Sequence, residues 1–193
     1  MYPADLPQRP QTFKDTPEYR CLSYTWGEPP EDHRILVNEH IFQVRKNLFE
    51  FLELATEVYP DEPLWIDALC ISHINTQEKS HQVQRMGTIY ENATEVVVWL
   101  GKRLTDERMW SKRGLRSFLE TRIFSRGWTW EPGLCDGMLQ LSRQYGTEYV
   151  VRAICEHPYW TRAWIAQEIL LQDNIVILVG CEKIEWDRFG QVL

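Results

Sequence analysis

Two side chains with useful chemistry stand four residues apart near the C-terminal end of the chain. Trp164 and Glu168 lie in the run Y-W-T-R-A-W-I-A-Q-E-I-L-L-Q (159–172), which predicts a short helix before a buried strand. Residues four apart on a helix share one face. When the two groups lie side by side, the indole could stack on a flat ring of a ligand and the carboxylate could stabilise a developing positive charge. Pairing of Glu168 with a cation such as Arg162 is the structural alternative, and spacing alone favours neither.

A second group of candidate residues ends the first predicted strand, at Ser23-Tyr24-Thr25-Trp26-Gly27. Gly27 would let the backbone approach a ligand while Tyr24 and Trp26 stack on it. The structural alternative, that both aromatic rings belong to the core and the glycine makes a turn, is about equally favoured.

Asp67 is the third candidate, because it interrupts the apolar run L-W-I-D-A-L-C-I (64–71). A buried carboxylate needs a partner or a ligand. A structural ion pair with an arginine such as Arg85 is the commoner solution, and a direct role in binding or catalysis is the alternative.

The composition is that of an acidic globular protein. The chain has 193 residues, of which 44% are hydrophobic, and a formal net charge of -7, so it suits one domain and disfavours nucleic-acid binding. The five cysteines show no C-x-x-C spacing, so neither a disulfide framework nor a metal site is indicated, and a reducing cytoplasmic setting fits best. No apolar run is long enough for a membrane span. No phosphate-binding glycine loop is present, which argues against an ordinary P-loop or Rossmann enzyme.

The elements that must position these residues alternate between strand and helix. Apolar runs predict strands at residues 19–26, 64–71, 95–100 and 174–179, and a hairpin at residues 35–44. Helical spacing predicts helices at residues 47–58, 76–92 and 145–156, the first with Asn47 as its N-cap. The run at 64–71 suits a central strand that is buried on both faces.

This alternation predicts an α/β fold with a parallel sheet covered by helices on both faces. Ligands of such sheets bind at the carboxyl ends of the strands, where the motif at residues 23–27 and Asp67 are expected. Residues 1–17 contain four prolines and predict an extended N-terminal arm. The domain is expected to span residues 18–193, with a helical insertion at about residues 102–157.

Five motifs, in this order, resemble the successive blocks of the fungal HET (heterokaryon incompatibility) domain. They are L-S-Y-T-W-G (22–27), L-W-I-D-A-L-C-I (64–71), Q-E-K-S-H-Q-V-Q-R-M-G-T-I-Y-E-N-A (77–93), V-V-V-W-L-G (96–101) and W-T-R-A-W-I-A-Q-E (160–168). The resemblance implies a cell-death effector that acts in nonself recognition when genetically unlike hyphae fuse. It also implies a remote similarity to TIR domains, which have a flavodoxin-like sheet and include enzymes that hydrolyse NAD.

The resemblance implies a role for each candidate residue. Glu168 would be the catalytic carboxylate, because W-I-A-Q-E (164–168) resembles the TIR segment that carries the catalytic glutamate. It would stabilise an oxocarbenium-like state as the bond between nicotinamide and ribose breaks, while Arg162 would meet the pyrophosphate. NAD would be a substrate here and not a cofactor. The residues expected to bind it are Ser23, Tyr24, Trp26, Gly27, Asp67, Arg162 and Trp164.

The expected partners are NAD or a related nucleotide, a second copy of the chain in the active state, and other domains of a larger receptor. A function of another class stays open, namely a non-enzymatic signalling module that triggers death by self-association and recruitment of partners. Release of nicotinamide from NAD by the purified protein distinguishes the two.

Overall fold

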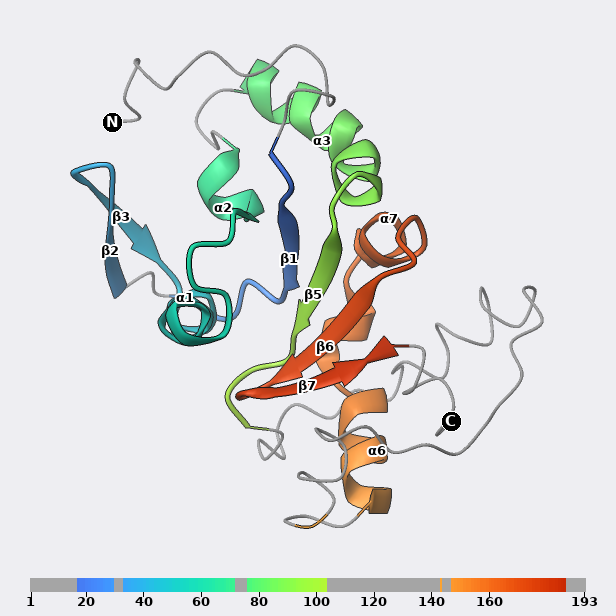
Figure 1. Ribbon diagram of the computed structural model, residues 1–193. Helices are drawn as coiled ribbons and strands as arrows, with labels where there is room; N and C mark the ends of the chain where they lie inside the picture. The colour runs from blue at the N-terminus through green and yellow to red at the C-terminus, as the bar shows by residue number, and fades with distance from the viewer. Residues whose placement is uncertain (1–16, 30–32, 72–75, 104–142, 144–146, 187–193) are drawn as a thin grey trace.

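A five-stranded sheet forms the centre of the protein, in the strand order β4-β1-β5-β6-β7 (Figure 1). The computed structural model describes residues 17–29, 33–71, 76–103, 143 and 147–186. The strands of the sheet are β1 (Arg20–Tyr24), β4 (Leu64–Trp65), β5 (Glu95–Trp99), β6 (Ile175–Val179) and β7 (Glu182–Glu185). The predicted N-terminal arm and most of the predicted insertion lie outside the described residues.

Successive residues of the central strands face two separate hydrophobic cores, as the alternation of side chains along a strand requires. One core takes Cys21, Val96, Val98, Ile175 and Ile177. The other takes Leu22, Tyr24, Val97, Trp99 and Leu178. Because both faces of β1, β5 and β6 are buried, most of their residues are apolar, with Ser23 of β1 as a buried polar exception.

Helices cover both faces of the sheet, as predicted. On one face lie α1 (Lys46–Val58) and α2 (Asp67–Cys70). On the other face lie α3 (Thr76–Glu91), α6 (Thr147–Cys155), the 3-10 helix η4 (Pro158–Thr161) and α7 (Ile165–Ile169). The two groups flank the strands on opposite sides in Figure 1. The predicted α/β class and the predicted helices at 47–58, 76–92 and 145–156 are confirmed.

The sheet is mixed and not wholly parallel. Strands β4, β1, β5 and β6 are parallel, but β7 runs antiparallel to β6. Val179 pairs with Glu182, so only two residues connect these strands, and a connection that short cannot make the crossover that parallel strands need. Gly180 begins the turn with a φ of 56°, a conformation that glycine adopts without strain.

The prediction of a central strand at residues 64–71 is wrong. Only Leu64 and Trp65 pair with β1, at the edge of the sheet. The chain then turns into α2, where the amide of Cys70 donates to the carbonyl of Ile66 at 2.8 Å. Asp67 stands in the first turn of this helix, where a carboxylate favours helix formation. A short apolar run is compatible with a strand or a helix, and here the tertiary contacts favour the helix.

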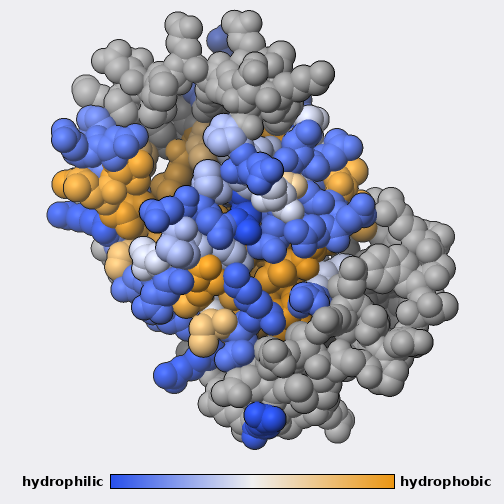
Figure 2. Space-filling model, in the orientation of Figure 1, coloured by the Kyte–Doolittle hydropathy of each residue, from blue (hydrophilic) through white to orange (hydrophobic). Residues whose placement is uncertain are grey.

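The predicted hairpin is confirmed as a separate two-stranded sheet of β2 (His33–Val37) and β3 (His40–Val44). Asn38 and Glu39 both have positive φ, as a tight primed turn requires. Leu36 and Ile41 are paired across the strands, and each is 69% exposed. Figure 2 shows hydrophobic surface at its left, where Figure 1 places the hairpin.

Asn47 is not the N-cap of α1, contrary to the prediction. The cap position belongs to Arg45, whose side chain makes no capping hydrogen bond. The Asn47 amide nitrogen instead donates to the carbonyl of Thr25 at 2.6 Å, and its oxygen accepts from the indole of Trp99 at 2.9 Å. Asn47 therefore joins α1 to the ends of β1 and β5, and it fixes the loop that follows β1.

We expect Asn47→Ala to lower the free energy of unfolding by about 1–3 kcal/mol, because the Thr25 carbonyl loses its amide donor. Urea unfolding followed by tryptophan fluorescence measures this. Asn92→Ala is the matched control, because that amide makes its hydrogen bond, to the carbonyl of Thr88, on the surface. Equal losses for both variants would contradict the role assigned to Asn47.

Candidate functional site

A buried polar cluster joins the C-terminal motif to the carboxyl end of β1. Glu168 is 1% exposed, and both of its carboxylate oxygens are bound by the Arg162 guanidinium, at 2.7 and 2.9 Å. Ser23 of β1 also contacts this carboxylate, and its hydroxyl oxygen lies 3.0 Å from Nη1 of Arg162. Tyr159 contributes its phenol, which is hydrogen-bonded to Ser23.

Only one assignment of donors and acceptors fits the hydrogen bonds of this cluster. A carboxylate only accepts, so Ser23 must donate its one hydroxyl hydrogen to Glu168. Ser23 therefore accepts from the phenol of Tyr159 and from Arg162. The cluster thus directs its donors toward the Glu168 carboxylate.

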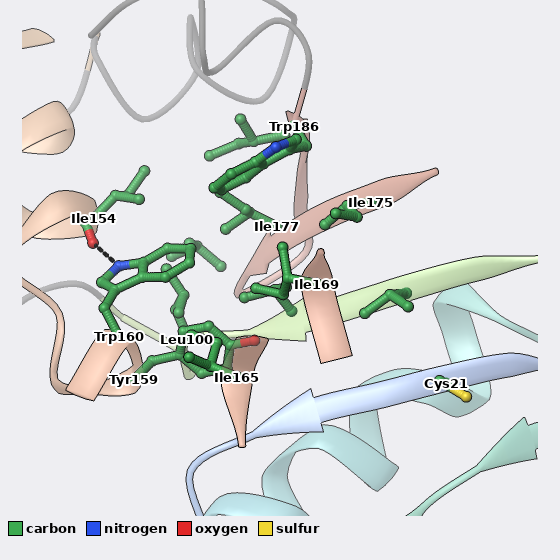
Figure 3. Packing of buried hydrophobic residues seen from close by; sticks show 14 of the residues in the cluster. Cys21, Leu100, Ile154, Tyr159, Trp160, Ile165, Ile169, Ile175, Ile177 and Trp186 are labelled. Carbon is green, nitrogen blue, oxygen red and sulfur yellow. Dashed lines mark hydrogen bonds between the residues drawn. The ribbon is translucent and has the colours of Figure 1, made fainter. Parts of the chain in front are cut away.

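The 3-10 helix η4 positions two members of the cluster. His157 caps it, with Nδ1 accepting the amide hydrogen of Tyr159 at 3.1 Å, and Pro158 follows at the first helical position. Trp160 anchors the helix in the core, where its indole donates to the carbonyl of Ile154 at 2.6 Å (Figure 3). Tyr159 is thereby fully buried, and Arg162 stands at the C-cap beside it.

Helix α7 carries Glu168 and is too short to be stable alone, so tertiary contacts must hold it. Ile165 and Ile169 anchor it in the core. Leu171, just beyond the helix, packs on α3 at Gly87, where a Cβ atom would lie 3.1 Å from the leucine methyl group. A larger residue at position 87 would push the leucine side chain outward by a few tenths of an ångström. The arrangement turns Glu168 inward, toward Ser23.

Burial and the Glu168 charge set the ionisation of the neighbouring groups. Burial, and then the negative charge of Glu168, raise the pKa of the Tyr159 phenol, although Arg162 partly offsets this. Burial, the largest single effect, would lower the pKa of Arg162, but the charge and hydrogen bond of Glu168 together with the neighbouring phenols of Tyr159 and Tyr90 outweigh it, and the net shift is upward. The phenol therefore stays protonated, and the guanidinium stays charged, throughout the physiological pH range.

A second polar group lies near the same end of β1, at the surface. The indole of Trp26 donates to Asp67 at 2.9 Å, and the Arg45 guanidinium lies 5.7 Å from the centre of the Trp26 ring. Arg45 also donates to the carbonyl of Gly27 at 2.7 Å, and Gly27 has a φ of 76°. Burial and the charge of Asp67 raise the pKa of the Tyr24 phenol. Asp67 therefore has an indole as a hydrogen-bond partner and is not left without one.

Some predicted site residues that lie close together in the sequence differ in their exposure to solvent. The Trp164 indole is 49% exposed, whereas the Glu168 carboxylate is buried, so their exposures do not support a shared pocket wall. Tyr24 is only 2% exposed and packs in the core, whereas Trp26 is 37% exposed. Of the two aromatic residues of the first motif, only Trp26 offers a surface to a ligand in this conformation. The roles in binding and catalysis stay predictions.

Three residues of the site were not found from the sequence, namely Tyr159, His157 and Arg45. Tyr159 lies in the run P-Y-W, where an aromatic residue indicates only core packing. His157 has no metal-ligand spacing, and its hydrogen-bond partners are the backbone of its own helix and the backbone of Leu100. Arg45 meets Trp26 only because the hairpin brings the start of α1 beside the loop after β1.

Two features are absent from the part of the chain that the structure describes. No group of three or more His, Cys, Asp and Glu residues there could hold a metal ion. No helix in that part of the chain combines the length and apolar character that a bilayer crossing requires.

The comparisons with known proteins agree with the motifs. This is an α/β domain with a mixed sheet, and the family described as "Heterokaryon incompatibility protein (HET)" matches residues 19–168. The chain belongs to this HET family. It is 35% identical over 103 residues to Heterokaryon incompatibility protein 6, OR allele, of Neurospora crassa, an alignment that covers 47% of this chain and 15% of that relative. No solved structure matches the chain significantly.

The chain spans only a small part of this relative's length. The matched family region, residues 19–168, begins just before β1 and ends at Glu168. It therefore contains every member of the polar cluster, from Ser23 to the acid itself.

We expect the Arg162–Glu168 pair to be strongly coupled in stability. Glu168→Gln or Arg162→Met alone leaves one buried charge without its partner and should cost about 3–5 kcal/mol. The double variant should cost less than the sum of the two, because no charge is left unpaired. Urea denaturation of all four proteins measures the coupling, and additive losses would show that the pair is not a unit.

Protonation of His157 should destabilise the protein in acid. Burial lowers the pKa of His157 from 6.5 to about 4, so between these values the unfolded chain binds more protons than the folded one. Stability should therefore rise with pH across this window, by on the order of 3 kcal/mol from this residue. His157→Asn keeps an acceptor at the cap position and should show a shallower slope between pH 4 and pH 6.5 in urea melts. An unchanged slope would exclude His157 as the cause.

Proposed function

We propose that this chain is the effector domain of a fungal protein of nonself recognition, and that it triggers cell death by hydrolysing NAD. Membership of the HET family and the similarity to a heterokaryon incompatibility protein support the first statement. The observation that carries the second is the fixed, buried carboxylate of Glu168, bound to Ser23 at the carboxyl end of a central strand.

The topology of the sheet supports a ligand at this place. Without the hairpin, the five strands follow the order 2-1-3-4-5, which is the order of flavodoxin-like sheets. Such sheets bind ligands where the strand order reverses, between the first and third strands, which here are β1 and β5. The antiparallel β7 departs from that pattern at the far edge, away from the reversal.

The proposed reaction breaks the bond between C1′ of the ribose and the nicotinamide nitrogen. The bonding electron pair leaves with nicotinamide, a water oxygen adds to C1′, and the water releases one proton, which yields nicotinamide, ADP-ribose and H⁺. Glu168 would stabilise the positive charge that develops on the sugar. Nicotinamide is a good leaving group, so the reaction needs no proton donor.

In the described conformation, Glu168 cannot touch a substrate, because Arg162 holds both carboxylate oxygens and the side chain is buried. The proposal therefore takes this conformation as the resting one. Self-association, or another domain of a larger protein in the cytoplasm, would promote binding of the substrate at this site.

A non-enzymatic signalling module is the second candidate, and two observations favour it. Glu168 is fully engaged in structural contacts, as a carboxylate that only holds the fold would be. Leu36 and Ile41 expose apolar side chains on the hairpin, where a partner or a second copy could bind. This module would kill by assembly and recruitment.

The two candidates differ in an assay of NAD cleavage. Concentrated or crowded wild-type protein should release nicotinamide from NAD, as measured by chromatography. Glu168→Asp keeps the charge but withdraws it by one methylene, so turnover should fall about a hundredfold or more, and toxicity on expression in a fungus should fall with it. Glu156→Gln is the control, since that carboxylate belongs to a surface pair with Arg152 and should leave turnover unchanged.

A toxic wild type that releases no nicotinamide would overturn the enzymatic proposal in favour of the signalling module. Far-UV spectra and melting curves must also show that each variant is folded under the assay conditions, since Glu168 contributes to the fold.

A further inference from the structure

The two partners of the buried ion pair differ in their access to solvent. The Arg162 side chain is 18% exposed, whereas that of Glu168 is 1% exposed. Solvent therefore reaches part of the Arg162 side chain, whereas the carboxylate of Glu168 is shielded from it. Glu168 becomes accessible only if Arg162 moves.

Moving Arg162 away from Glu168 costs free energy, and any ligand that opens the pair must offset this cost. Separation leaves Glu168 buried without its counter-charge, which is strongly unfavourable. A ligand that opens the pair must therefore offer an anion to Arg162 and a cation to Glu168 at the same time. NAD carries both groups, because its pyrophosphate is negative and its nicotinamide ring is positive.

We propose that Arg162 is a substrate-operated latch, which exchanges the Glu168 carboxylate for the pyrophosphate of the bound nucleotide. The cationic nicotinamide riboside then takes the place of Arg162 beside Glu168. Arginine suits this exchange, because its planar fork binds a carboxylate or a phosphate in the same bidentate way. The inference rests on the proposed NAD hydrolysis and assigns the regulation of that same site.

Ser23 and Tyr159 hold the carboxylate in place during the exchange. Ser23 donates to Glu168 from β1, and Tyr159 supports Ser23, so both contacts join these residues directly and not through Arg162. The acid thus keeps an oriented hydrogen bond after the guanidinium leaves. The latch moves, and the carboxylate stays fixed.

The experiment separates the two halves of the substrate. Nicotinamide riboside has the same scissile bond as NAD and the same cationic ring, but it has no pyrophosphate. Wild-type protein should cleave nicotinamide riboside slowly, and ADP added in trans should accelerate that cleavage roughly 5- to 150-fold, the usual range of coupling between two sites. If the pyrophosphate only tethers the substrate, ADP should leave the rate unchanged or inhibit it.

Replacing Arg162 should change the two substrates in opposite directions. Arg162→Ala removes the latch, so nicotinamide riboside should be cleaved faster and without stimulation by ADP, whereas NAD should be cleaved more slowly because the pyrophosphate loses its partner. Arg162→Lys, which keeps the charge but not the fork, should shift both rates in the same directions by less. Arg152→Ala is the control, since this arginine belongs to a pair on the surface.

Each outcome bears on one statement. If the wild type cleaves NAD and also cleaves nicotinamide riboside equally fast without ADP, the latch is overturned while the proposed function stands. If the wild type cleaves neither compound, the proposed function fails and the latch fails with it. Should Arg162→Ala not fold, stimulation of the wild type by ADP still decides the question.

Discussion

The ion pair between Arg162 and Glu168 is the interaction on which the rest of the site depends. It places a negative charge where only 1% of the side chain meets solvent, and it needs contributions from β1, η4 and α7 to do so. A buried charge is tolerable only when it is paired and hydrogen-bonded. The cluster therefore couples the correct placement of three segments to one another.

A buried ion pair is a costly way to join segments, because apolar side chains of similar size often stabilise a fold equally well or better. Its presence in the last motif of the matched region suggests a purpose beyond stability. A switch is one of the best-attested uses of such pairs, and the unequal exposure of Arg162 and Glu168 suits that use. The short helix α7 adds to this, since its position depends wholly on tertiary contacts, among them the approach of Leu171 to Gly87.

Much of the fold could be predicted from the residue pattern, and the failures have physical causes. Runs rich in apolar residues identified β1, β5 and β6, because strands buried on both faces favour apolar side chains. The prediction for residues 64–71 was wrong because a short apolar run also suits a helix such as α2. Asn47 was predicted as a cap but found tertiary partners in Thr25 and Trp99. Capping propensity describes a local preference of the chain, and stronger hydrogen bonds to residues distant in the sequence override it.

The sequence by itself determined the α/β class, the burial of the central strands, and the motifs of the HET family, because these depend on side-chain type and local spacing. Only the tertiary structure decided what Glu168 contacts. Ser23 lies 145 residues away along the chain, and Tyr159 is 136 residues from Ser23, so no local pattern relates them. Hydrogen bonds and ion pairs act over a few ångströms, and folding alone brings such distant residues within that range.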